Sequence, residues 1–254
     1  SKLKVSEVHT RLMEIAQEAG GGSQERKVVK MARLISELDS LSAKYVTRVP
    51  LGKLRLGFSE LTILDALSWM LSKDKSKRGE IEAAYNVQAD IGQISYFIKS
   101  KGIRGLADMR VVLGTPIMPA LCQRLPTVEE IIKKMGQVAV EPKYDGTRLQ
   151  MHFRKGEAKE SKIVTRNLEN VTEMFPDLLA AGRREIKARE VILDGEAIGF
   201  DPKTGKFLPF QETIKRKRKY LVRETASKIP LKYFVFDILF KDGEDLLGLP
   251  FSKR

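Results

Sequence analysis

The sequence predicts a multidomain protein in which an all-α N-terminal part is followed by an α+β part with mostly antiparallel sheets. Apolar residues recur at helical spacing through residues 1–112, where strand-type alternation is scarce. Two prolines and a glycine then interrupt this pattern within 111–119. From Val138 onward, short alternating stretches are separated by turn residues. We therefore place a domain boundary between residues 112 and 113, so that the second domain covers 113–254.

Helices are expected to fill the first part. The glycines at 20–22 end a first helix, and Ser23 opens a second one. Further helices are expected over 41–48, 59–72, 79–88 and 90–100, and Asp90 is expected to cap the last of them.

The second part is expected to alternate between strands and helices. A short helix over 127–135 is capped by Thr127, and two more helices are expected near 176–188 and 209–226. Strands are expected over 138–143, 148–154, 162–166, 190–200 and 231–240.

Glycine-containing basic turns separate the helices of the first part, and Lys53 and Arg55 stand in one of them. Backbone N–H groups in such turns bind phosphate oxygens, while Lys and Arg add charge without reading bases. This arrangement is typical of DNA binding without sequence specificity. The same turns also fit the ordinary caps and loops of a helical bundle, and the first part alone leaves both interpretations open.

Composition narrows the class of partner. The formal net charge of +13 over 254 residues indicates a polyanionic partner, most commonly nucleic acid. Cys122 is the only cysteine, which excludes an internal disulfide and a cysteine-rich metal site, and two histidines are too few for a histidine metal centre. The sequence lacks an apolar run long enough to span a bilayer, so we expect a soluble intracellular protein with no membrane partner.

The stretch that organises the second part is Glu141-Pro142-Lys143-Tyr144-Asp145-Gly146-Thr147-Arg148. It follows an apolar alternation and predicts a strand, a tight Asp-Gly turn and a second strand. A lysine held there at the edge of a cleft is partly desolvated, which favours the neutral, nucleophilic amine. For the isolated motif, a hairpin with a solvated lysine is the alternative.

Three later stretches carry further candidate residues. Arg166 stands at the end of a strand, where its planar fork of donors can hold a phosphate or ribose oxygen. Glu196 follows an Asp-Gly pair on an apolar strand, where a carboxylate can bind a ribose hydroxyl or Mg²⁺. Phe236 lies in an aromatic strand and can stack on a purine. Taken singly, each also fits a solvated, turn or core residue.

Together these stretches resemble the ordered motifs of covalent nucleotidyltransferases, specifically the ATP-dependent DNA ligases of the archaeal and eukaryotic replicative type. The residues at 54–57, 61–67 and 84–87 look like the helical DNA-binding domain of that family. Those at 116–125 resemble its entry into the adenylation domain, and those at 210–219 resemble its basic helix.

The resemblance implies a reaction in three steps. Lys143 would attack the α-phosphorus of ATP, expel pyrophosphate and form a lysyl-AMP intermediate. The AMP would pass to the 5′-phosphate of a nick, and the 3′-hydroxyl would displace it to seal the strand. Mg²⁺, or Mn²⁺ in its place, and arginines would neutralise charge. Whether ADP or GTP can replace ATP stays open.

The resemblance also implies roles for the other candidates. Glu141 would contact adenine, Arg148 and Arg166 the nucleotide and the nick phosphate, and Glu196 the ribose or the metal, while Phe236 would stack on the base. The DNA backbone would be contacted by Lys53, Arg55, Lys215, Arg216, Lys217 and Arg218. For any one residue of the basic run, a solvated helix face is the alternative.

The sequence departs from the family pattern at its end, because it stops before the family's later motifs. We therefore expect a fragment of a larger ligase that is impaired in adenylation.

The resemblance also implies partners, namely nicked double-stranded DNA and a sliding clamp, and it implies that the intact enzyme is a monomer. The location would be cytoplasmic and nucleoid-associated in an archaeon, or nuclear in a eukaryote. The alternatives are a non-catalytic DNA-binding module and another lysyl-nucleotidyltransferase of the RNA ligase or capping type.

Overall fold

The computed structural model describes residues 3–52, 55–57, 59–107, 109–119, 122–156, 160–218 and 220–254. Contacts between Cα atoms divide the chain into two compact units, Ser1–Leu61 and Thr62–Arg254. The boundary that we place between residues 112 and 113 stays a prediction. Among the described residues, no helix is long and apolar enough to cross a membrane.

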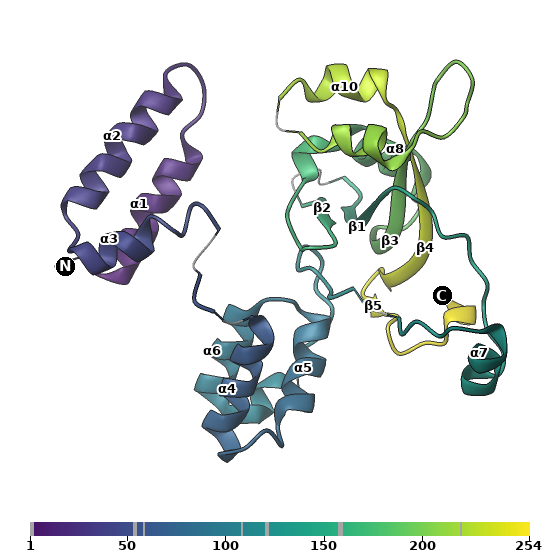
Figure 1. The fold of residues 1–254 in the computed structure, drawn as a ribbon, viewed down its shortest axis with the longest axis horizontal. Helices are drawn as coiled ribbons and strands as arrows, with labels where there is room; N and C mark the ends of the chain where they lie inside the picture. The colour runs from purple at the N-terminus through teal and green to yellow at the C-terminus, as the bar shows by residue number, and fades with distance from the viewer. Residues whose placement is uncertain are drawn as a thin grey trace. The chain divides into compact units, whose positions relative to one another are not determined.

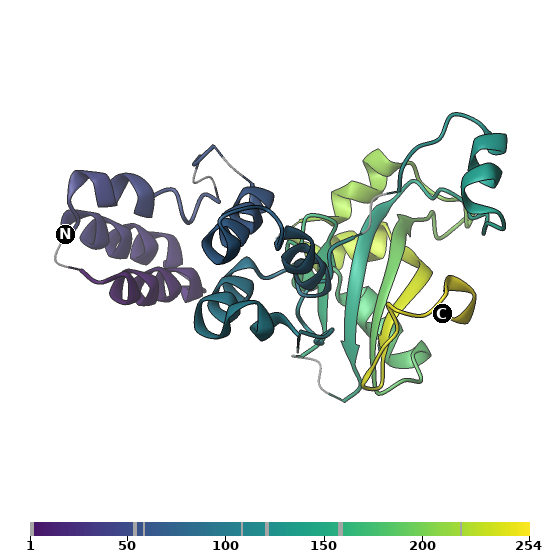
Figure 2. The ribbon, with the colours of Figure 1, turned by 90° about the horizontal axis from the view of Figure 1, so that it is seen from below.

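The described residues of the first unit include the helices α1 (Val5–Gln17), α2 (Ser23–Ser36) and α3 (Ser40–Val46). Helices α1 and α2 lie side by side as a hairpin (Figures 1 and 2). The turn between them contains Gly20 and Gly22, both with positive φ, so the expected glycine stop is confirmed. Helix α3 is capped by Asp39, whose carboxylate accepts the Ser42 N–H at 2.8 Å.

The second unit begins with helices α4 (Glu60–Ser72), α5 (Arg78–Val87) and α6 (Ile91–Lys101), followed by the 3-10 helix η1 (Gly102–Leu106). The cap expected for α6 is confirmed, because Asp90 Oδ1 accepts the N–H groups of Gly92 and Gln93 at 2.9 and 3.0 Å. The buried side chains of this bundle include Leu64, Ile81, Ile94 and Ile98.

The rest of the second unit contains a curled antiparallel sheet (Figure 1). In the described part of the chain its strands are β1 (Thr147–Arg154), β2 (Lys162–Thr165), β3 (Glu190–Gly199), β4 (Leu231–Lys241) and β5 (Glu244–Asp245). Their order is β2-β1-β3-β4-β5 and every pairing among them is antiparallel. The sequence predicts mostly antiparallel sheets but not the order of the strands.

The strand expected over 138–143 is wrong, and with it the hairpin that would have carried Lys143. Residues 138–145 belong to no strand. The physical reason is that both edges of β1 are already paired, one with β2 and the other with β3. The backbone before Thr147 therefore has no free edge of β1 to join, and Val140 is 91% exposed.

The single helix expected over 209–226 is also wrong. The chain instead forms α9 (Phe210–Thr213), the 3-10 helix η3 (Ile214–Arg216) and α10 (Val222–Lys228). Leu221 adopts a left-handed backbone with φ of 54°, which interrupts helical continuation before α10. The remaining helices are α7 (Val128–Met135), η2 (Thr172–Met174), α8 (Pro176–Glu185) and η4 (Phe251–Lys253).

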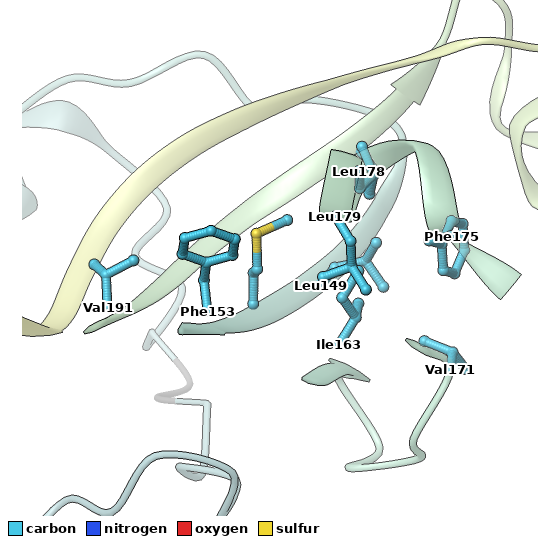
Figure 3. Close-up of a cluster of buried hydrophobic side chains, with 10 residues drawn as sticks. Leu149, Phe153, Ile163, Val171, Phe175, Leu178, Leu179 and Val191 are labelled. Atoms are coloured by element: carbon cyan, nitrogen blue, oxygen red, sulfur yellow. The ribbon is translucent and has the colours of Figure 1, made fainter. Parts of the chain in front are cut away.

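One face of the sheet forms the main hydrophobic core (Figure 3). Alternate residues of β1 point into it, and α8 covers them because strand side chains repeat with a period of two. The cluster includes Leu149, Met151, Phe153, Ile163, Phe175, Leu178, Leu179 and Val191. The intervening residues of β1 therefore point to the opposite face.

That opposite face buries polar side chains, which fix the segment before the sheet. Gln150 Oε1 accepts the Ile117 N–H at 2.9 Å, and Gln150 Nε2 donates to the Ile117 carbonyl at 3.1 Å. His152 Nδ1 accepts the Gly114 N–H at 3.0 Å, so its other nitrogen must carry the proton that it shares with Gln150 Oε1 at 2.9 Å. Burial, with Lys162 nearby, lowers the pKa of His152 to about 3.

This neutral histidine makes a prediction about acid stability. The unfolded imidazole binds a proton below pH of about 6.5, whereas the folded one does so only near 3, so folding stability should fall as pH falls between these values. The slope attributable to His152 rises as pH falls through 6.5 and approaches about 1.4 kcal/mol per pH unit near pH of about 5. Urea denaturation of the wild type and of His152→Gln between pH 7 and 5 measures it. A variant that keeps the full slope would show that another group is responsible.

Candidate functional site

A cleft of about 790 Å³ opens in the second unit, and it collects the candidate residues of four separate stretches. The six predicted nucleotide-contacting or catalytic residues all line it, namely Glu141, Lys143, Arg148, Arg166, Glu196 and Phe236. Cys122, Thr165, Asn167, Phe210 and Ile214 also line the cleft and have no role assigned from the sequence, and Lys217 lines it although the sequence assigns Lys217 to the DNA backbone. Thr165 and Asn167 flank the predicted Arg166 in the sequence, whereas Cys122, Phe210 and Ile214 come close to the candidate residues only in the folded chain.

The segment that carries Lys143 is fixed by packing against the strands rather than by a hairpin. The Tyr144 ring stacks on Phe234 of β4, with centroids 4.4 Å apart and planes at 24°. Gly146 lies so close to β3 that an added Cβ would stand 2.4 Å from the Ala197 carbonyl oxygen. Lys143 itself is exposed, so the partial desolvation expected from a strand-backed turn is not observed.

Strand register places the charged residues on one face of the sheet. Arg148 of β1 stands opposite Glu196 of β3, and Gln150 stands opposite Asp194. The Arg148 guanidinium makes a bidentate pair with Asp194, with Nε 3.1 Å from Oδ1 and Nη2 2.7 Å from Oδ2. This pair raises the pKa of Arg148 and holds its planar fork in one orientation.

Glu196 is half-buried beside these cations. Burial raises the pKa of its carboxyl, while a backbone hydrogen bond from Gly146 and the charges of Arg148 and Lys143 act in the opposite direction. The positive charge of Lys143 therefore acts on the Glu196 carboxylate across the cleft that both residues line. A partly desolvated carboxylate on a rigid strand is well suited to accept a cation or a hydroxyl group.

Phe236 reaches the cleft from a bulge in β4. Asp194 pairs with Asp237 and Gly195 pairs with Val235, so Phe236 is an extra residue on this strand. A bulge re-aims side chains, and the Phe236 ring centre lies 5.3 Å from the Arg148 guanidinium carbon. Gly195 permits the close strand approach, since a Cβ there would stand 2.6 Å from the Phe234 carbonyl oxygen.

Arg166 follows β2 on a tight turn and is exposed. The Leu168 N–H donates to the Thr165 carbonyl at 2.8 Å, and Leu168 adopts a left-handed φ of 62°. The Thr165 N–H donates to the Glu169 carbonyl at 3.0 Å. Arg166 therefore projects from a well-defined turn at the cleft, as expected for a strand-end arginine.

The basic run does not form one solvated helix face. Arg216 is buried, with 1% of its side chain exposed, where it forms an ion pair with Asp177 and lies 5.8 Å from the centre of the Phe175 ring. A buried arginine has no surface from which to contact DNA, so the structure removes Arg216 from the predicted DNA-binding set.

The basic residues next to Arg216 in the sequence are exposed rather than buried. Lys217 lines the cleft and forms an ion pair with Glu169. Lys215 is exposed and pairs with Glu212 at 2.5 Å, and Arg218 is exposed and donates to Thr225 Oγ1 at 3.1 Å. In the N-terminal unit, Arg55 is exposed with φ of 51°, whereas Lys53 lies outside the described residues.

The lining also bears on metal binding. Three carboxylates line the cleft, those of Glu141, Asp145 and Glu196. In the described ranges, no group of three or more His, Cys, Asp or Glu side chains is close enough to form a metal cage. A cation at Glu196 would therefore need most of its ligands from water and from a bound molecule, which is how proteins commonly hold Mg²⁺.

An exposed lysine beside an oriented arginine, a half-buried carboxylate and an aromatic ring is the combination expected of a covalent nucleotidyltransferase site. The sequence profile described as "ATP dependent DNA ligase domain" matches residues 119–254, and the one described as "DNA ligase N terminus" matches residues 1–68. The chain belongs to the ATP-dependent DNA ligase family.

Curated relatives that are named DNA ligase are similar in sequence to this chain over nearly its whole length. A probable DNA ligase of Dictyoglomus turgidum is 45% identical over 99% of this chain, and a DNA ligase of Pyrobaculum calidifontis is 42% identical over 99%. This chain spans only 43% and 42% of those two relatives. Among solved structures, mycobacterial DNA ligase D complexed with ATP and MES is 26% identical over 45% of this chain and 33% of its own. Its TM-score of 0.34 is too low to carry a structural argument.

The ion pair between the buried Arg216 and the partly exposed Asp177 yields a prediction about stability. Asp177→Ala should lower the free energy of unfolding by about 3 kcal/mol, because it leaves the buried Arg216 guanidinium without its partner. Adding Arg216→Met should recover part of that loss, since the double variant buries no unpaired charge. Urea denaturation of the three proteins measures both effects.

Lys228→Ala is the matched control, because Lys228 pairs with Glu224 at the surface and the change should alter stability little. If Asp177→Ala were as mild as Lys228→Ala, solvent would have to reach the Arg216 guanidinium.

Proposed function

We propose that this chain is the nucleotide-binding and lysine-bearing portion of an ATP-dependent DNA ligase that seals 3′-hydroxyl/5′-phosphate nicks in duplex DNA. The observation that carries the proposal is that Lys143, two arginines, Glu196 and Phe236 line one cleft although they come from four separate stretches. Membership of the ligase family and the relatives named DNA ligase support the same activity.

The first chemical step is adenylation of Lys143. The amine attacks the α-phosphorus of ATP, a P–N bond forms, and the bond to the bridging oxygen of pyrophosphate breaks while the amine loses a proton. In the steps that follow, the AMP passes to the 5′-phosphate of the nick, and the 3′-hydroxyl displaces it. Positioning and charge neutralisation supply most of the acceleration in such phosphoryl transfers.

The surroundings of Lys143 suit these roles. Phe236 offers a ring face on which adenine can stack, and Glu141 at the same cleft would accept hydrogen bonds from the base. Arg148 is pre-oriented by Asp194, so its guanidinium keeps a fixed position when the nucleotide enters. Arg166 at the turn after β2 would contact the nucleotide or the nick phosphate.

The site suits a Mg²⁺ ion that is bound jointly by the protein and by the nucleotide. Glu196 would hold it together with phosphate oxygens, since Mg²⁺ commonly uses one or two carboxylates plus substrate phosphates. When bound, the ion would neutralise charge on the phosphates. Mn²⁺ accepts the same oxygen ligands and is the alternative metal.

The exposed basic residues would contact the phosphate backbone of a nicked DNA duplex. The net charge of +13 supports a polyanionic substrate, and Arg55, Lys215 and Arg218 are exposed. Lys217, which the sequence assigns to the same backbone, is exposed as well but lines the nucleotide cleft. We keep Lys53 in this set on its sequence position alone. The helical DNA-binding domain, the sliding clamp, the monomeric state and the cytoplasmic or nuclear location stay predictions.

Incubation with α-labelled ATP and Mg²⁺ tests the proposal. We expect a version extended to the length of its relatives to take up label that survives SDS denaturation, and the Lys143→Ala variant to take up none. If neither ATP nor another nucleotide labels the extended protein, Lys143 is a turn lysine and the alternative of a non-catalytic DNA-binding module gains support. Labelling from GTP alone would indicate the capping type instead.

The close approach of Gly146 to β3 gives a second prediction. In the extended protein, Gly146→Ala should reduce Lys143 labelling by about tenfold or more, because the new Cβ meets the Ala197 carbonyl and displaces the lysine. Gly79→Ala is the control, since a Cβ at Gly79 meets no atom within 4 Å. Equal labelling of the two variants would mean that the position of this segment is unimportant.

A further inference from the structure

One wall of the cleft is built by a short segment with two faces. Phe210, Ile214 and Lys217 line the cleft, at spacings of four and three residues. Thr213 and Arg216 lie between them in the sequence and are both buried, each with 1% exposure. The segment therefore turns one face to the cleft and the other to the protein interior.

The buried face holds the wall in place. Thr213 Oγ1 accepts the Gly199 N–H of β3 at 3.0 Å, and Arg216 pairs with Asp177 of α8. Two elements of the surrounding structure thus anchor residues on either side of Ile214. Lys217 follows directly after Arg216, so its backbone position at the cleft is fixed by these anchors.

Within the described part of the chain, the side chain of Lys217 forms an ion pair with one carboxylate, that of Glu169. Lys217 lowers the pKa of the Glu169 carboxyl. Glu169 stands on the turn that follows β2, and its N–H donates to Thr165 Oγ1 at 3.3 Å. The Glu169 side chain is 55% exposed, and this carboxylate is not among the described groups that line the cleft.

We propose that Lys217 binds the phosphates of the nucleotide, and that Glu169 holds its ammonium only until the nucleotide enters. This inference deepens the proposed function and rests on it. Lys217 lines the same cleft as Lys143 and Phe236, so its charge faces the molecule that those residues contact. Among the described cations that line the cleft, Lys143 is the nucleophile, and Arg148 and Arg166 already have proposed roles at the nucleotide, so Lys217 is the remaining cation that can meet the phosphates.

Replacing Glu169 by a phosphate group as the partner of Lys217 should cost little free energy. An ion pair at this exposure contributes little stability, because water screens it. A phosphate oxygen offers a charge-assisted hydrogen bond to the same ammonium and adds negative charge where other cations already stand. The nucleotide can therefore replace Glu169 without disturbing the anchored backbone.

Calorimetric titration of the chain with ATP and with adenosine tests this assignment. Lys217→Met should weaken ATP binding by about tenfold and leave adenosine binding unchanged, because adenosine has no phosphate. Glu169→Gln should tighten ATP binding, because it removes the competing carboxylate. Lys228→Met is the control, since it breaks a surface Lys–Glu pair that does not line the cleft and should leave both affinities unchanged.

The outcomes separate this inference from the proposed function. If the wild-type chain binds ATP and Lys217→Met binds it equally well, only the assignment of Lys217 is overturned. That assignment is also overturned if ATP and adenosine binding weaken together, which would indicate a structural role, or if only binding of nicked DNA weakens. If the wild type binds no ATP, both proposals fail.

Discussion

The register between β1 and β3 is the constraint on which the rest of the site depends. It sets Arg148 opposite Glu196 and Gln150 opposite Asp194, so a cation, two carboxylates and an amide share one face. Because strand side chains alternate, the same register sends Leu149 and its apolar neighbours to the opposite face. A slip of one residue would exchange the two faces, so the core and the cleft are specified together.

Hydrogen bonds and ion pairs of buried polar side chains hold this arrangement in place. Gln150 and His152 hold the segment that enters the sheet, and Asp194 orients Arg148 at the cleft. Arg216 anchors the wall formed by α9 and η3 through Asp177. Each of these groups has a specific partner, because a buried polar group without one is costly, although the Nε of Arg216 is left without a hydrogen bond. The exposed cations of the cleft are therefore carried by a rigid backbone, which keeps them in position to bind a charged ligand.

Much of the sheet could be predicted from alternation and turn residues, and the motif residues meet at one cleft as the resemblance implies. The strand before Lys143 could not be predicted correctly, because both edges of β1 are occupied by strands that follow it in the sequence. The burial of Arg216 was missed because five consecutive basic residues are typical of one solvated face. The spacing from Thr213 to Arg216 was a usable signal, since residues three apart share a helix face. Phe210 and Cys122 join the cleft only through the folded chain, so local patterns do not reveal them.

If this face of the sheet binds a nucleotide, its α-phosphate must lie at Lys143. A crystal structure of the protein with an ATP analogue that carries a methylene group between the α- and β-phosphates would show whether it does, because that analogue cannot transfer AMP to the lysine. We expect adenine stacked on Phe236, the α-phosphate beside Lys143 Nζ and the Arg148–Asp194 pair intact. A nucleotide bound elsewhere, or one whose base lies away from Phe236 and whose phosphates lie away from Lys143, would contradict this assignment of the site.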